Sequence, residues 1–434
     1  MPTRARTFRI VSFGCKVNQA EGLALAARLR EFGLEETVAE DAVDLAIVNT
    51  CVVTAEAARQ GRQSIRRAAR LGAAVVVTGC GAHPAIRDAA LRQVEGCWFV
   101  EPDKERIADR LRAAWPDAVP ESLPPPTEVP ARSRAMLKVQ DGCPGGCAYC
   151  IVPKVRPDVR STPIGEAVRQ LEGFLGRGYR EVVICGIHLG LYGADLGPRA
   201  DLADLMECLL AVPGLGRLRL SSIEPMEVSD RLLALMRDEP QRLCPHLHLP
   251  LQSGDDGVLR QMRRPYTGGD YLDAVARIRE ALPLPAITTD VLVGFPGETD
   301  EAFARTLRIL REAAFSRLHV FPFSRRPGTR AADMADQVPR ETIRARREAA
   351  SALGRELAAA YRAALVGRPA RVVVETVHAD GSAEGLSERY IRVRIRRPLP
   401  RGTARHGILP VRLVGVAGDA LEGESDAACQ DSLA

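Results

Sequence analysis

Three cysteines near the middle of the chain lie close together in the sequence. Cys143, Cys147 and Cys150 form a C-x3-C-x2-C pattern, with Gly145 and Gly146 between the first two. Thiolates are the ligands that iron–sulfur clusters use, so three of them at this spacing could hold three irons of a [4Fe–4S] cube and leave the fourth iron open. The glycines allow the backbone to fold tightly around a bulky cofactor. The alternative is a chance group of inert, buried cysteines.

Three further cysteines are far apart in the sequence but follow similar segments. Cys15, Cys51 and Cys80 each come directly after a short apolar run, at steps of 36 and 29 residues. If the runs are parallel strands, their carboxyl ends meet at one edge of a sheet, where ligands gather. We therefore expect a second three-thiolate site. The alternative is that each is a small apolar residue at a strand end, as cysteine often is.

Residues 7–118 must supply this sheet. Apolar runs and helical periodicity alternate along this part of the chain, which is typical of a parallel sheet covered on both faces. The five prolines of residues 119–130 then predict a stiff linker at a domain boundary. We expect strands at 8–13, 45–50, 73–78 and 98–100, and helices at 21–32, 55–71 and 84–94.

Residues 131–330 alternate strand and helix again. Six strands with intervening helices fit either a doubly wound sheet or a partial barrel, and in both the working groups lie past the carboxyl ends of the strands. The cysteine loop follows the first of these strands, where such groups are expected. We expect strands at 136–140, 181–187, 217–223, 246–252, 287–293 and 318–323, and helices at 165–175, 201–210, 229–237, 269–282 and 299–314.

The other strand ends carry the remaining candidates. Gly186, Ser222 and Gln252 lie at the ends of the second, third and fourth expected strands, and together such loops could line a cofactor pocket. Individually they fit ordinary loops with helix caps. The histidines are not spaced as a metal-binding set, and His246 and His248 are interpreted as structural residues of one strand.

The C-terminal part differs in composition. Residues 331–365 are rich in Ala and Arg and predict a long connecting helix. Alternating segments at 370–376, 390–395 and 409–416 predict a small all-β barrel. Residues 367–420 hold ten arginines against five acidic residues, which suits contact with nucleic acid or is simply an arginine-rich solvated surface. Residues 421–434 are acidic and are expected to be disordered.

Composition limits the class of protein. The 434 residues are 46% hydrophobic and 26% charged, as expected for a soluble globular chain of about two to four domains. No apolar run is long enough to span a membrane, and the N-terminus does not resemble a signal peptide. We therefore expect a cytoplasmic protein, in which eleven cysteines indicate metal binding or catalysis before disulfides.

Taken together, these residues resemble the radical S-adenosylmethionine (SAM) methylthiotransferase family. The loop from Cys143 to Cys150 is similar to its cluster-binding loop, and the C-terminal segment resembles its TRAM domain. Two departures lie in the loop: Pro144-Gly145-Gly146 replaces the usual asparagines, and Pro157 replaces a usual glycine. Neither removes a thiolate. The other segments similar to the family's motifs are Phe13–Gln19, Asn49–Cys51, Thr78–Cys80, His246–Thr267, Thr289–Glu298 and Phe323–Thr329.

The resemblance implies the domain organisation of an α/β protein. Residues 1–118 would form an N-terminal methylthiotransferase domain with a flavodoxin-like parallel sheet and its own cluster. After the linker at 119–130, residues 131–365 would form a partial (β/α)6 radical SAM barrel with its connecting helix. Residues 366–420 would form the RNA-binding TRAM barrel, followed by the tail at 421–434.

The resemblance also implies two [4Fe–4S] clusters and SAM as cofactors. At Cys143, Cys147 and Cys150, SAM would bind the open iron and be cleaved to a 5′-deoxyadenosyl radical, which takes hydrogen from C2 of an adenine. The second set, Cys15, Cys51 and Cys80, would hold the sulfur to be inserted and methylated. These six cysteines are the implied catalytic and metal-binding residues. The residues expected to contact SAM are Tyr149, Gly186, Ser222 and Gln252.

A short segment indicates the branch of the family. Cys15-Lys16-Val17-Asn18-Gln19 resembles the bacterial branch that acts on N6-threonylcarbamoyladenosine (t6A) at position 37 of tRNA. Other branches modify isopentenyladenosine in tRNA or a ribosomal protein aspartate, and a non-catalytic iron–sulfur RNA-binding sensor is a further alternative. The implied partners are the tRNA anticodon loop, a low-potential flavodoxin- or ferredoxin-like electron donor and an unidentified sulfur donor, with no membrane.

Overall fold

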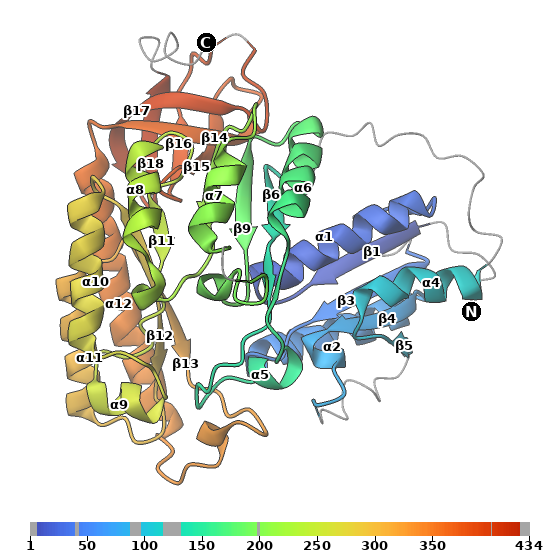
Figure 1. The fold of residues 1–434 in the computed structure, drawn as a ribbon, viewed down its shortest axis with the longest axis horizontal. Coiled ribbons are helices and arrows are strands. Elements are labelled where there is room, and N and C mark those ends of the chain that lie inside the picture. Colours follow the sequence, from blue (N-terminus) through green and yellow to red (C-terminus); the bar gives the residue numbers. More distant parts are fainter. Residues whose placement is uncertain are drawn as a thin grey trace. The chain divides into compact units, whose positions relative to one another are not determined.

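The computed structural model describes residues 7–39, 43–86, 97–115, 132–197, 200–400 and 402–425 (Figure 1). The chain divides into two compact units, which we describe separately. The first comprises Met1–Glu128, Asp141–Val159 and Ser324–Ala332, and the second comprises Val129–Gln140, Arg160–Phe323 and Asp333–Ala434. The loop at 143–150 lies in the same compact unit as the three N-terminal cysteines.

The first unit is built on a parallel sheet of order β2-β1-β3-β4-β5, as predicted. Its strands are β1 (Thr7–Ser12), β2 (Glu35–Glu36), β3 (Leu45–Thr50), β4 (Ala74–Gly79) and β5 (Cys97–Val100). Its helices are α1 (Lys16–Glu31), α2 (Ala55–Arg70), α4 (Lys104–Ala114), α5 (Val152–Val155) and the short 3₁₀ turn η1 (Cys80–Ala82).

Two details of the first unit differ from the sequence prediction. Helix α1 was expected to start at Glu21, but it starts at Lys16 with Cys15 as its N-cap. The helix expected at 84–94 is not seen at 84–86, and residues 87–96 lie outside the described part of the chain. The linker at 119–130 also lies outside it.

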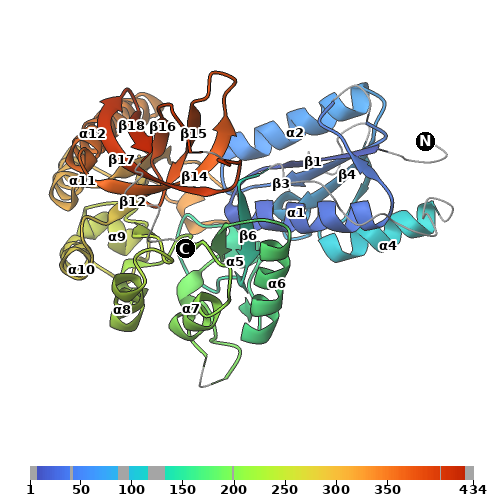
Figure 2. The ribbon, with the colours of Figure 1, turned by 90° about the horizontal axis from the view of Figure 1, so that it is seen from above.

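Alternating side chains of the central strands contribute to two hydrophobic cores, one on each face of the sheet. Leu45 and Ile47 pack with α1 and α4, whereas Ala46 and Val48 pack with α2. Figure 2 shows α2 on one side of β1, β3 and β4, and α1 and α4 on the other. The second core also contains Ile151 and Val155, so the segment after the cysteine loop packs on the α2 face of the sheet.

The second unit contains six parallel strands that follow the chain in order. They form the sheets β10-β9-β6 and β11-β12-β13, and isolated bridges such as Ser222 with His248 connect β10 to the β11 side. The arrangement is a partial barrel, one of the two architectures that the strand pattern allowed. The strands are β6 (Arg134–Lys138), β9 (Glu181–Cys185), β10 (Arg217–Leu220), β11 (His246–His248), β12 (Ala286–Val293) and β13 (Arg317–Pro322).

Amphipathic helices cover the outside of this barrel. The core beneath them is contributed by strands and helices alike, including Leu137, Ile184, Leu205 and Leu310. No helix in the described ranges is long and apolar enough to cross a membrane. The main helices are α6 (Ile164–Gly176), α7 (Leu202–Leu210), α8 (Asp230–Asp238), α9 (Asp256–Gln261), α10 (Gly268–Ala281) and α11 (Asp300–Ala313); the shorter elements are β7 (Gln140–Asp141), β8 (Arg160–Ser161), η3 (Leu189–Leu191) and η4 (Pro225–Glu227). The short turn η5 (Arg330–Ala332) belongs to the first unit.

A long helix, α12 (Arg340–Leu365), leads to a closed five-stranded barrel of order β14-β15-β16-β18-β17, consistent with a TRAM-like domain. The predicted disordered tail begins too early, because Leu421 lies in the last strand and pairs with Val393. Strand β15 was also not anticipated. The strands are β14 (Pro369–Val377), β15 (Ala383–Ser387), β16 (Arg392–Ile395), β17 (Ile408–Ala417) and β18 (Ala420–Ser425).

A buried ion cluster attaches the small barrel to β9 and β10. Arg217 and Arg219 each bond to the carboxylate of Glu181, and all three side chains are at most 1% exposed. Burial alone would raise the pKa of Glu181, but the two arginines lower it to about 2. The guanidinium groups also donate to four backbone carbonyls of the small barrel, those of Arg371, Leu386, Ser387 and Glu388.

Candidate functional site

The dispersed cysteines lie at the carboxyl ends of three adjacent strands, as predicted. Cys15 follows β1, Cys51 follows β3 and Cys80 follows β4, and these strands are neighbours in the sheet. The three thiols are close enough to interact electrostatically with one another. Gly14 makes the approach possible, because a Cβ added there would lie 2.6 Å from Sγ of Cys51. The sheet therefore brings the three sulfurs to one site.

Asn18 fixes the loop that carries Cys15. Its side-chain amide is buried and donates to the backbone carbonyls of Phe13 at 2.7 Å, Thr50 at 3.2 Å and Asn49 at 3.3 Å. These bonds hold the loop after β1 against the end of β3. Asn18 was noticed in the sequence as part of a branch-specific motif, and in the structure it positions two of the three cysteines.

The surroundings of the dispersed cysteines suit a bound metal cluster. Desolvation raises the pKa of the Cys15 thiol and raises that of Cys51 to about 12, and the neighbouring thiols add to both shifts. The backbone N–H of Val53, 3.5 Å from Sγ of Cys51, opposes this. Cys15 and Cys51 in this setting become thiolates together only when a cation offsets their charge. The site therefore fits a cationic iron–sulfur group.

The second cysteine set occupies a tight loop of the first unit. At Gly142, φ is +78° and an added Cβ would lie 1.8 Å from the carbonyl oxygen of Asp158, so only glycine fits. The N–H of Cys143 donates to the carbonyl of Arg156 at 2.9 Å, and the N–H of Gly145 lies 3.4 Å from Sγ of Cys143. In this loop, where Pro144-Gly145-Gly146 departs from the family pattern, the backbone N–H of Gly145 points toward the sulfur of Cys143.

Each cysteine set offers three thiolates. A cubic iron–sulfur cluster takes its thiolate ligands on separate irons, so a set of three leaves one iron open. Among the described residues, His248, Asp290 and His319 form a separate group, whose ligand atoms all lie within 4.8 Å of one another.

Arg156 connects the cysteine loop to helix α1. Its guanidinium donates to both carboxylate oxygens of Glu21 at 2.8 Å and to Asp141 at 2.7 Å. Nζ of Lys104 lies 2.6 Å from the same glutamate. The charge of Arg156 also acts to lower the pKa of the Cys15 thiol. Sequence reasoning missed this link because Glu21 and Arg156 are 135 residues apart and neither belongs to a recognisable motif.

The residues expected to contact SAM are placed as follows. Tyr149 is part of the cysteine loop and is half-buried. Gly186 follows β9, where an added Cβ would lie 2.7 Å from Leu189. Ser222 follows β10, and Gln252, at φ +67°, follows β11. Their roles in binding SAM stay predictions.

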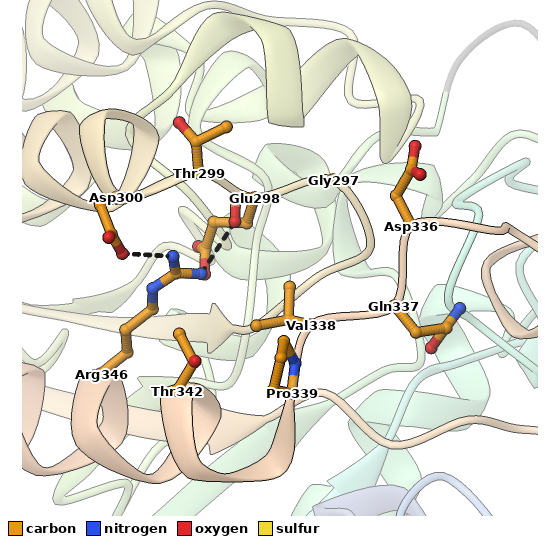
Figure 3. Close-up of a pocket in the computed structure, with 10 residues that line it drawn as sticks. All are labelled: Gly297, Glu298, Thr299, Asp300, Asp336, Gln337, Val338, Pro339, Thr342 and Arg346. Atoms are coloured by element: carbon orange, nitrogen blue, oxygen red, sulfur yellow. Dashed lines mark hydrogen bonds and ion pairs between the residues drawn. The ribbon is translucent and has the colours of Figure 1, made fainter.

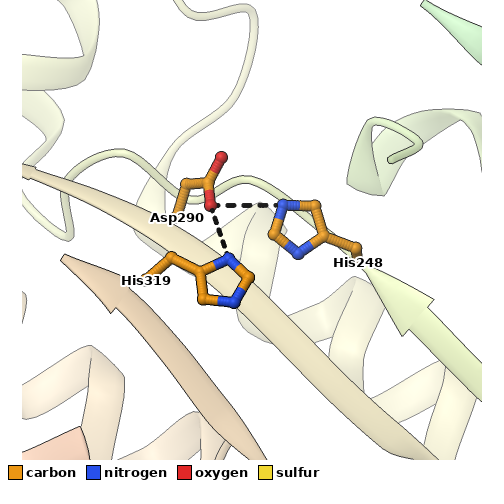
Figure 4. Close-up of side chains that lie close together, drawn as sticks. All are labelled: His248, Asp290 and His319. Atoms are coloured by element: carbon orange, nitrogen blue, oxygen red, sulfur yellow. Dashed lines mark hydrogen bonds and ion pairs between the residues drawn. The ribbon is translucent and has the colours of Figure 1, made fainter. Parts of the chain in front are cut away.

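Sequence reasoning also missed a polar group in the second unit. Figure 4 shows His248, Asp290 and His319 turned toward one another from β11, β12 and β13. His248 was interpreted as a structural residue, and the histidines were judged not to form a set. Their spacing in sequence hides the group, because neighbouring parallel strands bring together residues that are about 30 to 40 positions apart.

A separate cavity of about 560 Å³ lies where the loop after β12 meets the start of α12. Figure 3 shows Arg346 on its wall, where it bonds to Glu298 at 2.8 Å and to Asp300 at 2.7 Å. Burial raises the pKa of Glu298, which also accepts the N–H of Gly294 at 2.7 Å. These bonds fix the loop to the helix, which gives this wall a structural role.

Comparison with known proteins covers both units. Residues 137–310 match the family described as "Radical SAM superfamily", and residues 7–96 match "Uncharacterized protein family UPF0004". The chain is 36% identical to "Threonylcarbamoyladenosine tRNA methylthiotransferase MtaB" of Chlamydia pneumoniae, over 96% of this chain and 98% of that one. It is 34% identical to "tRNA-2-methylthio-N(6)-dimethylallyladenosine synthase" of Acidothermus cellulolyticus, over 90% and 80%.

Solved structures support the fold. The radical SAM methyltransferase TsrM of Kitasatospora setae matches with a TM-score of 0.55 at 15% identity, over 76% of this chain and 77% of that one. The predicted α/β fold class is confirmed, and so are the predicted cofactors, because this family uses SAM and [4Fe–4S] clusters. On similarity that extends over nearly its whole length, the chain belongs to the radical SAM methylthiotransferase family.

Proposed function

We propose that this enzyme inserts a methylthio group at C2 of t6A at position 37 of tRNA. This chain is 35–36% identical to relatives named for t6A and 31–34% identical to relatives named for dimethylallyladenosine, so identity alone does not separate the two. The share of each relative's length that aligns with this chain distinguishes the two groups. The alignments cover 88–98% of the relatives named for t6A, but only 79–81% of those named for dimethylallyladenosine.

The two cysteine sets would hold the two clusters. When bound, the clusters supply one-electron cleavage of SAM at Cys143, Cys147 and Cys150 and carry the inserted sulfur at Cys15, Cys51 and Cys80. The protein's part is to fix the sulfurs and balance their charge, through the N–H donors to the sulfurs, the amide of Asn18 and the ion pairs of Arg156. A low-potential electron donor, flavodoxin- or ferredoxin-like, is required, and the sulfur source is open.

Helix α2 offers a contact for the RNA backbone. Its 16 residues contain five arginines and one acidic residue, Glu56, which pairs with Arg59 at 2.6 Å. Four of the arginines recur every three or four residues, so they form a stripe about 16 Å long on one side of the helix, next to its buried face. A row of guanidinium groups suits successive phosphates. The stripe consists of Arg59, Arg62, Arg66 and Arg70.

The small C-terminal barrel would make a weaker electrostatic contact than its sequence indicated. Strand β18 adds Glu422 and Glu424, so residues 367–425 hold ten arginines against seven acidic residues. Arg396, which is exposed and directly follows β16, pairs with both glutamates. Deleting the barrel is also a poor test, because it would strip Arg217 and Arg219 of their carbonyl partners.

The proposed reaction is tested by mass spectrometry of tRNA nucleosides. A strain that lacks this enzyme should accumulate t6A and lose its 2-methylthio derivative, and a plasmid copy should restore the derivative. Loss of the methylthio derivative of isopentenyladenosine instead would assign the other tRNA branch. An unchanged tRNA profile with loss of a modified ribosomal protein aspartate would contradict a tRNA substrate altogether.

The α2 contact is tested by reversing two charges. Arg66→Glu with Arg70→Glu should weaken binding of a t6A anticodon stem-loop about tenfold and make its dependence on salt shallower, since each phosphate contact contributes about 0.7–0.9 to the log–log slope. The matched control is Arg347→Glu with Arg355→Glu, an equal charge change on exposed positions of α12. Equal effects of the two pairs would show a general charge effect and contradict a contact at α2.

A further inference from the structure

Three polar side chains from neighbouring strands meet in the partial barrel. Nε2 of His248 and Nδ1 of His319 each lie 3.3 Å from Oδ1 of Asp290. The two imidazole rings stack with centroids 5.4 Å apart. We refer to His248, Asp290 and His319 as the polar triad (Figure 4).

The polar triad faces the inside of the barrel. Leu247, Ile287 and Val291 belong to the hydrophobic core that the outer helices share. Successive side chains of a strand point to opposite faces, so His248 and Asp290, each one residue away from a core residue, point the other way. The side chains are 9% exposed at His248, 26% at Asp290 and 38% at His319. The triad therefore lies inside the barrel and is partly exposed there.

Two polar atoms of the triad remain available. His248 uses its second nitrogen on the hydroxyl of Thr288, at 2.9 Å. In Figure 4, the second oxygen of Asp290 and the second nitrogen of His319 point away from the group, and neither has a hydrogen-bond partner among the described residues. Burial would raise the pKa of Asp290, but hydrogen bonds from the two histidines hold it well below its usual range. Because Nδ1–H of His319 donates to Asp290, the second nitrogen of this imidazole accepts, so the triad presents a carboxylate oxygen beside an imidazole nitrogen and both are acceptors.

We infer that the polar triad binds the polar end of the substrate's N6 group and thereby selects t6A over adenosines with an apolar N6 group. This inference rests on the proposed function. A threonylcarbamoyl group carries a hydroxyl, which can donate to the second ring nitrogen of His319. It also carries carbamoyl N–H groups, which can donate to Asp290.

Rejection of the apolar group follows from the same atoms. A dimethylallyl group would desolvate Asp290 and His319 without offering them a hydrogen bond, and sites built to pair with polar groups discriminate strongly for that reason. Phe321 lies two residues after His319 on β13 and is 40% exposed, so it offers a ring on which a base could stack.

A divalent metal ion is the competing occupant. Two imidazole nitrogens and a carboxylate oxygen within 4.8 Å are a possible ligand set. However, both nitrogens already face one oxygen of Asp290 at hydrogen-bond distance, and the available atoms are the others. The geometry therefore favours an organic ligand that offers hydrogen-bond donors.

The test compares two stem-loop substrates on the reconstituted full-length enzyme. One carries t6A, and the other carries an N6-alkylcarbamoyl adenosine that lacks the carboxylate and the hydroxyl. His319→Ala should lower kcat/KM for t6A about tenfold, the loss expected for a neutral hydrogen bond, and lower it less than about threefold for the analogue. His319→Gln, which keeps an acceptor, should recover part of the loss. The control is His378→Ala, because His378 is an exposed histidine that directly follows β14.

The outcomes separate the inference from the function on which it rests. Equal losses on both substrates would assign the triad a structural role and overturn the inference, while methylthiolation of t6A by the wild-type enzyme would leave the proposed function in place. A stoichiometric transition metal beyond the cluster iron, lost in His319→Ala, would also overturn it in favour of a metal site. Wild-type enzyme that modifies an isopentenyladenosine stem-loop and ignores t6A would overturn the proposed function itself. Iron content and circular dichroism of each variant report whether it has folded.

Discussion

The two cysteine sets bring three sulfurs together in different ways, one through a local loop and the other through a sheet. Cys143, Cys147 and Cys150 lie on one loop, whose course is set locally by Gly142 and by the bond from Cys143 to Arg156. The dispersed set depends on the whole sheet, because its sulfurs meet only when β1, β3 and β4 are in register. The first site is therefore encoded by spacing in sequence, and the second by strand order.

The difference also affects how each site can fail. A local loop can be lost through a change at any one of its few residues, whereas the dispersed site is exposed to any disturbance of the sheet edge. Both sets nevertheless belong to one compact unit, so a change that loosens this unit should affect both. The following experiments separate the sets, from the largest expected effect to the smallest.

Removing one cysteine ligand from each set should separate SAM cleavage from methylthio transfer. Cys147→Ala should abolish reductive SAM cleavage, because the radical-generating cluster loses a ligand. Cys51→Ala should leave SAM cleavage measurable but abolish the methylthio product. Each variant should hold about half of the wild-type iron, about four atoms instead of eight. Iron content, 5′-deoxyadenosine and modified nucleoside are measured on the same preparation.

Cys208→Ala is the matched control for these ligand variants, since Cys208 is exposed on α7 and belongs to neither set. It should retain full iron and both activities. Loss of SAM cleavage in Cys51→Ala, with iron still bound at the loop, would contradict the division of labour between the sets.

Crowding the dispersed site should cost it iron. In Gly14→Ala the new Cβ would lie 2.6 Å from Sγ of Cys51, at a backbone φ of +89°. Gly72→Ala has the same φ of +89° with nothing within 4 Å, so it shares the backbone strain of about 1–2 kcal/mol without the clash. Only Gly14→Ala should lose iron from the dispersed site, measured by iron content and electron paramagnetic resonance. Equal iron loss in both variants would indicate that strain alone disrupts the site.

Cutting the link between the sets should have a smaller effect. Arg156→Gln leaves Glu21, only 14% exposed, with Lys104 as its remaining cation, and removing one partner from a largely buried pair costs about 3 kcal/mol. The urea midpoint should fall, and methylthio transfer should fall more than SAM cleavage. Arg169→Gln, which breaks an exposed pair with Glu166, should not change the midpoint measurably. Parallel loss of both activities would contradict a role in keeping the sets in register.

A pH dependence should distinguish the dispersed set in the metal-free protein. The unfolded chain releases the Cys51 proton near pH 9, whereas the folded chain retains it to about pH 12. The stability that this thiol contributes is therefore complete below pH 9 and is lost as the pH rises toward 12. The urea midpoint of the wild-type apoprotein should fall more between pH 8 and 10 than that of Cys51→Ser. Parallel curves for the two proteins would show that burial of this thiol does not affect stability.

The parts that could be predicted are those with a local signal. The four predicted strands of the first unit lie within one residue of their expected places, because continuous apolar runs identify buried parallel strands, whereas the two-residue strand β2 (Glu35–Glu36) has no such run and was not predicted. The missed start of α1 at Lys16 has a local cause, since Lys16, Asn18 and Gln19 are polar and hide the helical pattern. The tail was predicted too early because Glu422 and Glu424 in β18 were taken as a sign of disorder.

The sequence by itself determined the chemistry of this protein: six cysteines, their grouping into two sets, and the strand–helix alternation that places one set at a sheet edge. Only the tertiary structure decided which side chains surround them. Glu21 meets Arg156 across 135 residues, and His248 meets His319 across three strands. Such pairs depend on strand order and register, which arise from packing of the whole core, and no local pattern records them.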